Sequence, residues 1–285
     1  MKTILCLTDF TSTSNHAVRY GYDIAKCMEA EIILSNVTNV PAEIPQYETV
    51  LLPLENYRKA EAESMKALKT LQKKFELNDQ KPGFHPPIIC LHQTGIVTDV
   101  VNCIVDNKNV DLIVVGTHAS RGLKQLLLGN HVRYMIDSAT VPLLLVPPDT
   151  RVSRIHWIAL ATSFSPDNLV AAGKLIAIAE KQQLEFILMH IIKPKDSQSP
   201  AIKQQQFLTQ LYKNTGYQKI SCQSTTDHSV GDGLRKLCSK NENNGLLAIV
   251  HRNRNFIAEI LKGSITQKIS KKINFPLLVI QLPNI

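Results

Sequence analysis

The chain has 285 residues, 44% hydrophobic and 20% charged, with a formal net charge of +8 at pH 7. This length allows one large domain or two of about 140 residues, and the composition is ordinary for a globular protein with a sizeable core. No apolar run approaches the roughly 20 residues of a membrane-spanning helix, so we expect a cytoplasmic protein without membrane segments.

The six cysteines are scattered, without a C-x-x-C pair or a histidine at metal-ligand spacing. Most lie in apolar runs such as Ile89-Cys90-Leu91 and Asn102-Cys103-Ile104. We therefore expect buried free thiols in a reducing compartment and no metal site.

In the first half, short apolar runs alternate with amphipathic stretches. The apolar runs predict strands at 4–8, 32–37, 87–92, 112–115 and 143–146. Helices are predicted at 11–29, 56–75, 98–105 and about 130–137. Ser12, Thr13 or Ser14 is expected to cap the first helix. The second half repeats the pattern, with strands near 157–161, 185–190, 218–222, 246–250 and 277–281.

The two halves are copies of one unit. Gly129 and Gly263 are 134 residues apart, and so are Pro142 and Pro276, each of which precedes an apolar run. The openings Ile4-Leu5-Cys6-Leu7-Thr8-Asp9-Phe10 and Ile158-Ala159-Leu160-Ala161-Thr162-Ser163-Phe164 match at an offset of 154. The 20-residue difference falls in a longer middle loop of the first half. A repeat held at constant offsets predicts two domains, 1–149 and 150–285.

Strands that alternate with helices predict an α/β fold with parallel sheets and right-handed crossovers. We expect two doubly wound, Rossmann-like, five-stranded sheets of strand order 3-2-1-4-5, with helices on both faces. Ligands of such sheets bind beyond the carboxyl ends of the strands, where the chain reverses direction across the sheet.

This rule directs attention to the residues that follow the first and fourth strands. They are Thr8-Asp9-Phe10 and Gly116-Thr117-His118-Ala119, and farther on Gly129-Asn130-His131 precedes a helix. A glycine lets backbone approach a ligand, and the N–H groups of a helix start suit phosphate. Asp9 is placed to accept a hydrogen bond from a ribose hydroxyl.

The passage from Asp111 to Gly129, followed by Val141-Pro142-Leu143-Leu144-Leu145-Val146, resembles the signature end of universal stress protein domains. Nucleotide-binding members carry Gly, two residues, Gly, nine residues, Gly and then Ser or Thr. On this chain the matching positions hold Gly116, Ala119, Gly129 and Asn130, so two of the four depart from the pattern. The resemblance also equates Asp9 with the family's strand-one Asp and Val37 with a residue of the adenine pocket. His118 and His131 complete the candidate nucleotide site.

The second half departs further from that signature. Val250 and Asn253 stand where the first two glycines belong, Ser163 replaces the Asp, and Gly263-Ser264 remains. The resemblance therefore implies ATP, if bound at all, in the first domain. The alternative interpretation is structural: Gly116 and Gly129 serve a turn and a helix cap, and Asp9 is a turn residue.

Dedicated catalysis is not expected. The sequence lacks a G-x-x-x-x-G-K-[ST] loop, a G-x-G-x-x-G motif after a strand and a G-x-S-x-G elbow. No catalytic residue is assigned, and slow ATP hydrolysis is the most that the candidate site suggests.

We accordingly expect a non-catalytic regulatory or protective binding module of the stress response. One alternative is an ATP-dependent switch at the first-domain site. The other is a polyanion binder, because residues 151–285 carry 18 Lys and Arg against 8 Asp and Glu, including Arg252, Arg254, Lys268 and Lys271. Without interleaved aromatic residues there, nucleic acid is not the expected partner.

The resemblance also implies how the domains associate. In this family single domains pair through their fifth strands. An apolar edge strand invites such pairing, so we expect 141–146 to pair with 275–280 within one chain as a pseudo-dimer. Further assembly into a homodimer stays open.

Overall fold

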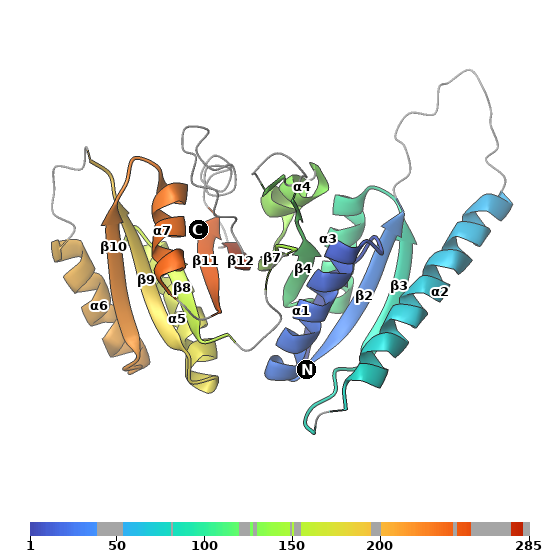
Figure 1. The fold of residues 1–285 in the computed structure, drawn as a ribbon, viewed down its shortest axis with the longest axis horizontal. Coiled ribbons are helices and arrows are strands. Elements are labelled where there is room, and N and C mark those ends of the chain that lie inside the picture. Colours follow the sequence, from blue (N-terminus) through green and yellow to red (C-terminus); the bar gives the residue numbers. More distant parts are fainter. Residues whose placement is uncertain are drawn as a thin grey trace, which may run out of the picture. The chain divides into compact units, whose positions relative to one another are not determined.

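The computed structural model describes residues 1–38, 54–80, 82–119, 126–127, 130–148, 150, 155–194, 201–241, 244–251 and 275–281, with 54–57, 118–119, 126–127 and 130 as backbone. Strands and helices alternate through both halves (Figure 1). The first half contains β1 (Lys2–Leu7), α1 (Ser12–Met28), β2 (Ala30–Thr38), α2 (Leu54–Asn78), β3 (Ile88–Thr94), α3 (Val97–Lys108), β4 (Leu112–Gly116), β5 (His118–Ala119), β6 (Leu126–Leu127), α4 (Asn130–Ser138) and β7 (Leu143–Val146).

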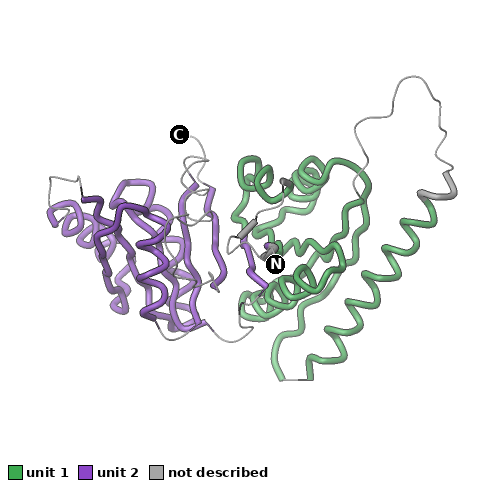
Figure 2. The backbone as a smooth tube through the Cα atoms, turned by 45° about the horizontal axis from the view of Figure 1, so that its top comes forward, with its two compact units in different colours: residues 1–116, 130–143 green, residues 117–129, 144–285 purple. Residues whose placement is uncertain are grey.

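The second half repeats this order. It contains β8 (Trp157–Ala161), α5 (Pro166–Lys181), β9 (Glu185–Ile192), α6 (Ala201–Thr215), β10 (Ile220–Thr226), α7 (Val230–Lys240), β11 (Gly245–His251) and β12 (Leu277–Gln281). By contacts the chain divides into two compact units, 1–116 with 130–143 and 117–129 with 144–285 (Figure 2). The sequence boundary at 149/150 stays a prediction.

The strands of each half lie in the predicted order. The first half runs β3-β2-β1-β4-β7 and the second β10-β9-β8-β11-β12. The pairs β1–β2, β1–β4 and β2–β3 are parallel, as are β8–β9, β9–β10, β8–β11 and β11–β12. At β7, hydrogen bonds run from Ile113 N to Pro142 O (3.0 Å) and from Thr117 N to Val146 O (3.0 Å). The α/β fold class and the strand order are thereby confirmed.

Helices cover both faces of the first-half sheet, as right-handed crossovers require. Helices α1 and α2 share one face, where the Tyr22 and Phe75 rings stack with centroids 5.4 Å apart. Helices α3 and α4 contact one another. Central strands such as β1 and β4 are consequently buried nearly throughout, which explains their continuous apolar sequences.

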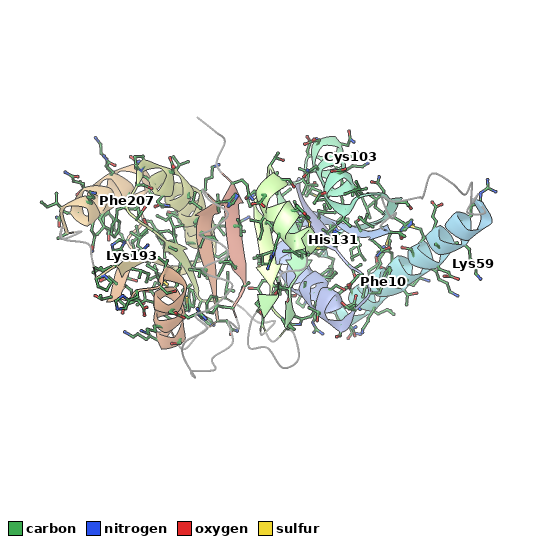
Figure 3. All side chains as sticks on the ribbon, turned by 90° about the horizontal axis from the view of Figure 1, so that it is seen from above. Phe10, Lys59, Cys103, His131, Lys193 and Phe207 are labelled. Carbon is green, nitrogen blue, oxygen red and sulfur yellow. The ribbon has the colours of Figure 1, made fainter. Side chains whose placement is uncertain are left out.

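Some local predictions need correction. The cap of α1 is Thr11, whose side chain accepts from Ser14 N, and none of the three residues predicted for that role. Strand β10 extends to Thr226, well beyond the predicted end. The cysteines are not uniformly buried: Cys27 is exposed, as is Cys103 (Figure 3), whereas Cys6 and Cys238 lie in the core. No described helix is both long enough and apolar enough to cross a bilayer.

Candidate functional site

The turn after β1 places Asp9 at the carboxyl edge of the sheet. Asp9 is exposed, and its Oδ1 accepts from Thr11 N (3.1 Å) and Thr11 Oγ1 (2.6 Å). This pattern is an Asx turn, which shapes the entry into α1. The carboxylate therefore has the structural role that the sequence offered as an alternative, at a position where a ligand could also reach it.

The next residue, Phe10, has a left-handed backbone with φ of 65°. Such a conformation is uncommon for a bulky residue. Local hydrogen bonds stabilise it, because Phe10 N donates to Thr8 Oγ1 (3.0 Å) and Asn15 Nδ2 donates to Phe10 O (3.1 Å). The unusual backbone conformation of Phe10 is therefore stabilised by hydrogen bonds at both its N and its O atom.

A buried polar network supports the turn from below. Asn36 on β2 donates from Nδ2 to Thr8 O (2.8 Å), and Ser64 Oγ on α2 donates to Asn36 Oδ1 (2.9 Å). Asn36 and Ser64 are both buried, so each bond satisfies groups that water does not reach. The network ties β1, β2 and α2 together.

Gly116 ends β4 and lies against the start of α1. A Cβ built on Gly116 would lie 3.0 Å from Thr13 O and 3.2 Å from Ser14 Cα. Helix backbone therefore occupies the space that the missing side chain leaves, and the packing of α1 on β4 already requires the glycine. Close approach of phosphate is not needed to explain it.

Thr117 follows Gly116 and is 2% exposed. Its Oγ1 is buried and has no hydrogen-bond partner among the residues that the structure describes. A buried hydroxyl without a partner is costly, so Thr117 Oγ1 is a candidate contact for a polar ligand group at the end of β4.

The other predicted site residues are placed as follows. Val37 is half-buried on β2, and because its neighbour Asn36 contacts α2, Val37 faces the α3 side of the sheet. His118 opens β5, Asn130 begins α4, and His131 is exposed in the first turn of α4 (Figure 3). Gly129 lies outside the described residues. The carboxyl ends of β1, β2 and β4 therefore bring Asp9, Val37 and Gly116 to one edge of the sheet.

These residues fit a nucleotide in part. Asp9 could accept a hydrogen bond from a ribose hydroxyl, Thr117 Oγ1 could donate to a phosphate oxygen, and the start of α4 offers N–H groups. Gly116 does not provide an open cradle, since the backbone of Thr13 and Ser14 fills it.

The second half carries the same turn with different chemistry. Phe164 also has a positive φ, 60°, and its N donates to Thr162 Oγ1 (2.8 Å). Ser163 stands where Asp9 does, and its N donates to Asn168 Oδ1 (3.1 Å). Val250, the counterpart of Gly116, is 5% exposed.

His190 takes the position of Asn36 in this half. Its Nδ1 lies 2.8 Å from Thr162 O, and because a carbonyl only accepts, Nδ1 carries the proton. The equivalent carbonyls of Thr8 and Thr162 therefore accept hydrogen bonds from different side chains, Asn36 in the first half and His190 in the second.

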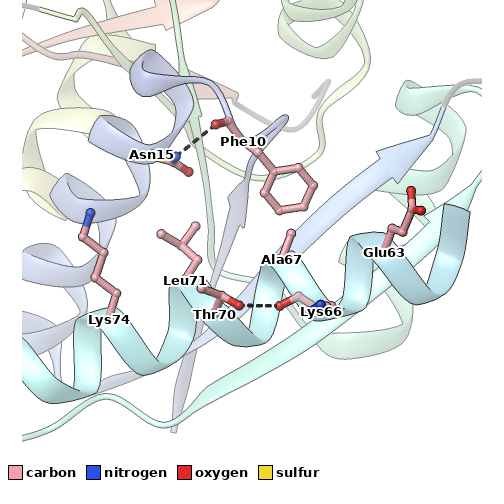
Figure 4. A pocket seen from close by; sticks show the side chains of 8 residues that line it. All are labelled: Phe10, Asn15, Glu63, Lys66, Ala67, Thr70, Leu71 and Lys74. Atoms are coloured by element: carbon pink, nitrogen blue, oxygen red, sulfur yellow. Dashed lines mark hydrogen bonds between the residues drawn. The ribbon is translucent and has the colours of Figure 1, made fainter.

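A groove beside Phe10 was not foreseen from the sequence. It lies between the start of α1 and the middle turns of α2, with a volume of about 420 Å³. Figure 4 shows its lining: Phe10, Asn15, Glu63, Lys66, Ala67, Thr70, Leu71 and Lys74. The sequence contained one signal for this groove, the recurrence of a phenylalanine, Phe10 and Phe164, after the first strand of each half. The spacing of apolar residues along α2 does not by itself reveal which face of that helix borders a groove.

Metal-ligand clustering adds no second site among the residues that the structure describes. Within the described ranges, no group of three or more His, Cys, Asp or Glu side chains could hold a metal ion. The stretch that contains Arg252, Arg254, Lys268 and Lys271 lies outside the described residues, so the polyanion hypothesis has no structural support here.

Comparisons with known proteins agree on one family. The model of the universal stress protein family matches residues 1–147 and 155–281. Universal stress proteins MJ0531 and MJ0577 of Methanocaldococcus jannaschii are 26% and 28% identical over 147 and 155 residues, which is 51% of this chain and 81% and 94% of those proteins. A solved universal stress protein from Archaeoglobus fulgidus shares the fold at 15% identity, with a TM-score of 0.64 over 98% of both chains.

Proposed function

The chain belongs to the universal stress protein family, and from that membership we propose that it is a cytoplasmic, non-catalytic binding module with a regulatory or protective role in the stress response. In this proposal the first half carries the binding site, and the second half supports it structurally.

The observation that carries this proposal is the divergence of two halves that share one framework. Both keep the positive-φ phenylalanine and the hydrogen bond that supports it. The first half is open beside that residue, with a groove at Phe10, whereas Phe164 in the second half is 9% exposed. The two halves share a fold, but only the first has a groove beside its turn phenylalanine among the described residues. This difference is consistent with a binding role confined to the first half.

Genetic complementation tests the role. Cells that lack the gene should survive a panel of stresses less well, and the full chain should restore survival. Incubation of the purified protein with ATP should release no phosphate above the blank. Unimpaired survival under every stress tested, or rapid phosphate release, would contradict the proposal.

A second candidate is an adenine-nucleotide switch in the first domain. Three features support it: Asp9 at the end of β1, the start of α4 at Asn130, and Thr117 Oγ1 at the end of β4, which has no hydrogen-bond partner among the described residues. In this function Asp9 would accept from ribose, Val37 would contact adenine, and Gly129, Asn130 and the neighbouring His118 and His131 would lie near phosphate. ATP at 100 times its dissociation constant should raise the free energy of unfolding by about 2.7 kcal/mol.

Asp9→Ala should reduce that effect, and Ser163→Ala at the matching second-half position should leave it unchanged. If ATP causes no thermal shift in the unsubstituted protein, the adenine-nucleotide switch is excluded. It leaves the binding-module proposal in place.

We further propose that β7 and β12 pair as an intrachain pseudo-dimer. Each is the last strand in the order of its half, and both are apolar, Leu143-Leu144-Leu145-Val146 and Leu277-Leu278-Val279-Ile280. An exposed apolar edge would promote association. Hydrogen exchange should therefore be slow at amides on both edges of each strand, and light scattering would show whether chains of 31.8 kDa assemble further. Fast exchange at alternate amides of β12 would refute the pairing.

A further inference from the structure

The groove beside Phe10 has a lining suited to a ligand. Its lining combines the apolar side chains of Ala67, Leu71 and Phe10 with the polar side chains of Asn15 and Thr70. Figure 4 shows the ring projecting from the turn toward Ala67 on α2. A volume of about 420 Å³ lies within the range of small-molecule sites, roughly 300–1,000 Å³.

The second half shows what fits in such a place. There Phe164 meets Phe207 of α6 edge to face, with ring centroids 5.6 Å apart, and Phe207 is 4% exposed. Helix α6 follows β9 as α2 follows β2. A phenyl ring from the covering helix thus lies beside the turn phenylalanine in one half, whereas the covering helix of the other half presents Ala67 to Phe10.

The charges around the groove favour an anion. Lys66 and Lys74 line it together with Glu63, which leaves an excess of one positive charge. In the part of the chain that the structure describes, neither Lys66 nor Lys74 takes part in an ion pair. Both ammonium groups are therefore available to a partner with an acidic group.

The groove is separate from the candidate nucleotide site. It lies on the sheet face that α1 and α2 cover, since Ser64 of α2 contacts Asn36 from that face. Val37, the next residue on β2, faces the opposite side. A ligand at Phe10 and a base at Val37 would consequently occupy different faces of the sheet.

We propose that this groove binds a small planar aromatic anion. The aromatic ring takes the place that Phe207 holds in the second half, edge to face with Phe10, which is the geometry that aromatic pairs prefer. The acidic substituent lies toward Lys66 and Lys74. The proposal goes beyond the nucleotide candidate and does not depend on it.

Titration with 1-anilinonaphthalene-8-sulfonate tests the proposal, with fluorescence as the readout. The full-length protein should bind one molecule saturably. Ala67→Phe, which adds a ring to α2 beside Phe10, should weaken binding at least tenfold, and Ala67→Leu should weaken it less. Circular dichroism confirms that each variant is folded. Should Ala67→Phe fail to fold, Ala67→Leu decides the outcome.

Two matched controls isolate the charge. The double variant Lys66→Gln/Lys74→Gln should weaken binding of the sulfonate about three- to tenfold. Binding of its neutral counterpart, N-phenyl-1-naphthylamine, should not change. Lys69→Gln/Lys73→Gln removes the same charge from exposed positions of α2 that do not line the groove, and it should alter neither probe.

Three results would overturn the proposal. The first is an absence of saturable binding by the unsubstituted protein, or binding unaffected by both Ala67 variants. The second is displacement of the sulfonate by ATP, which would merge this groove with the nucleotide site. The third is tighter binding of the dipeptide Glu-Tyr than of the sulfonate, which would make a peptide side chain the occupant.

Discussion

Gly116 and Thr13 approach so closely that no side chain fits between them without movement: a Cβ on Gly116 would lie 3.0 Å from the carbonyl oxygen of Thr13. This contact joins the end of β4 to the first turn of α1. It belongs to the framework of the first half, so the glycine has a structural function whether or not a ligand binds.

We therefore expect Gly116→Ala to destabilise the protein without any ligand present. The methyl group would push α1 away from β4 at a cost of about 1–3 kcal/mol, as overpacking usually does. Urea denaturation measures the change. Gly173→Ala on α5 is the matched control, because a Cβ there meets nothing within 4 Å and should stabilise the helix by about 0.5–1 kcal/mol. Equal effects of the two substitutions would contradict the packing argument.

Asp79 should contribute to stability through its three partners. Its carboxylate accepts from Lys26 Nζ, from Tyr22 OH (2.8 Å) and from His85 Nδ1 (2.9 Å), and the side chain is 9% exposed. These bonds join α1, α2 and the segment that leads to β3. Asp79→Asn should lower the free energy of unfolding by about 1–3 kcal/mol. Asp106→Asn, on an exposed position of α3, changes the same charge and should have little effect.

The contribution of Asp79 should depend on pH. Burial alone would raise the pKa of this carboxyl, but the hydrogen bonds from Lys26, Tyr22 and His85 outweigh burial and lower the pKa. A group with a lowered folded pKa stabilises the protein fully above its unfolded pKa, near 3.9, and loses that contribution as the pH falls through the folded value. The stability difference between the unsubstituted protein and Asp79→Asn should thus persist at pH 7 and shrink below about pH 4. A difference that grows on acidification would show that the carboxylate is not stabilised in the folded state.

The two phenylalanine turns should respond unequally to changes around them. Phe207 is 4% exposed and packs against Phe164, whereas Phe10 is half-buried beside an open groove. Phe207→Ala should therefore cost about 3–5 kcal/mol, and Phe10→Ala markedly less. Denaturant unfolding of the two variants provides the measurement. A larger loss from Phe10→Ala would mean that the groove is closed in solution.

The strands were predictable because helices cover both faces of the sheet, so that strand residues on either face are apolar. Runs such as Leu112-Ile113-Val114-Val115 are apolar throughout, and the predicted bounds of β7, β8 and β12 match the structure. Strand β10 was predicted too short because it ends the strand order of its half, where polar residues such as Gln223 and Thr226 are tolerated. The cap of α1 was missed because Thr11 begins a run of hydroxyl residues, and backbone geometry selects among them.

The candidate site was predictable in its position and less so in its chemistry. Parallel topology brings Asp9, Val37 and Gly116 to one edge, and this follows from the strand order. The sequence does not show that α1 backbone fills the space beside Gly116, since that depends on how closely a helix packs on a strand. For the same reason the groove at Phe10 emerges from tertiary packing: Phe10 lies beside an open groove on α2, whereas Phe164 packs against Phe207 of α6.

Cysteine labelling offers a test of the packing in both halves at once. Cys6 and Cys238 are buried, and burial raises the pKa of each thiol to about 12, so little thiolate exists in the folded protein. Cys27 and Cys103 are exposed. Iodoacetamide at pH 8 should therefore modify Cys27 and Cys103 within minutes to hours, while Cys6 and Cys238 react after denaturation; mass spectrometry of peptides identifies each site. Early labelling of Cys6 would mean that the contact of α1 with β1 opens readily, because the Cys6 thiol lies directly beneath that helix, 2.6 Å from where a Cβ on Gly21 would stand.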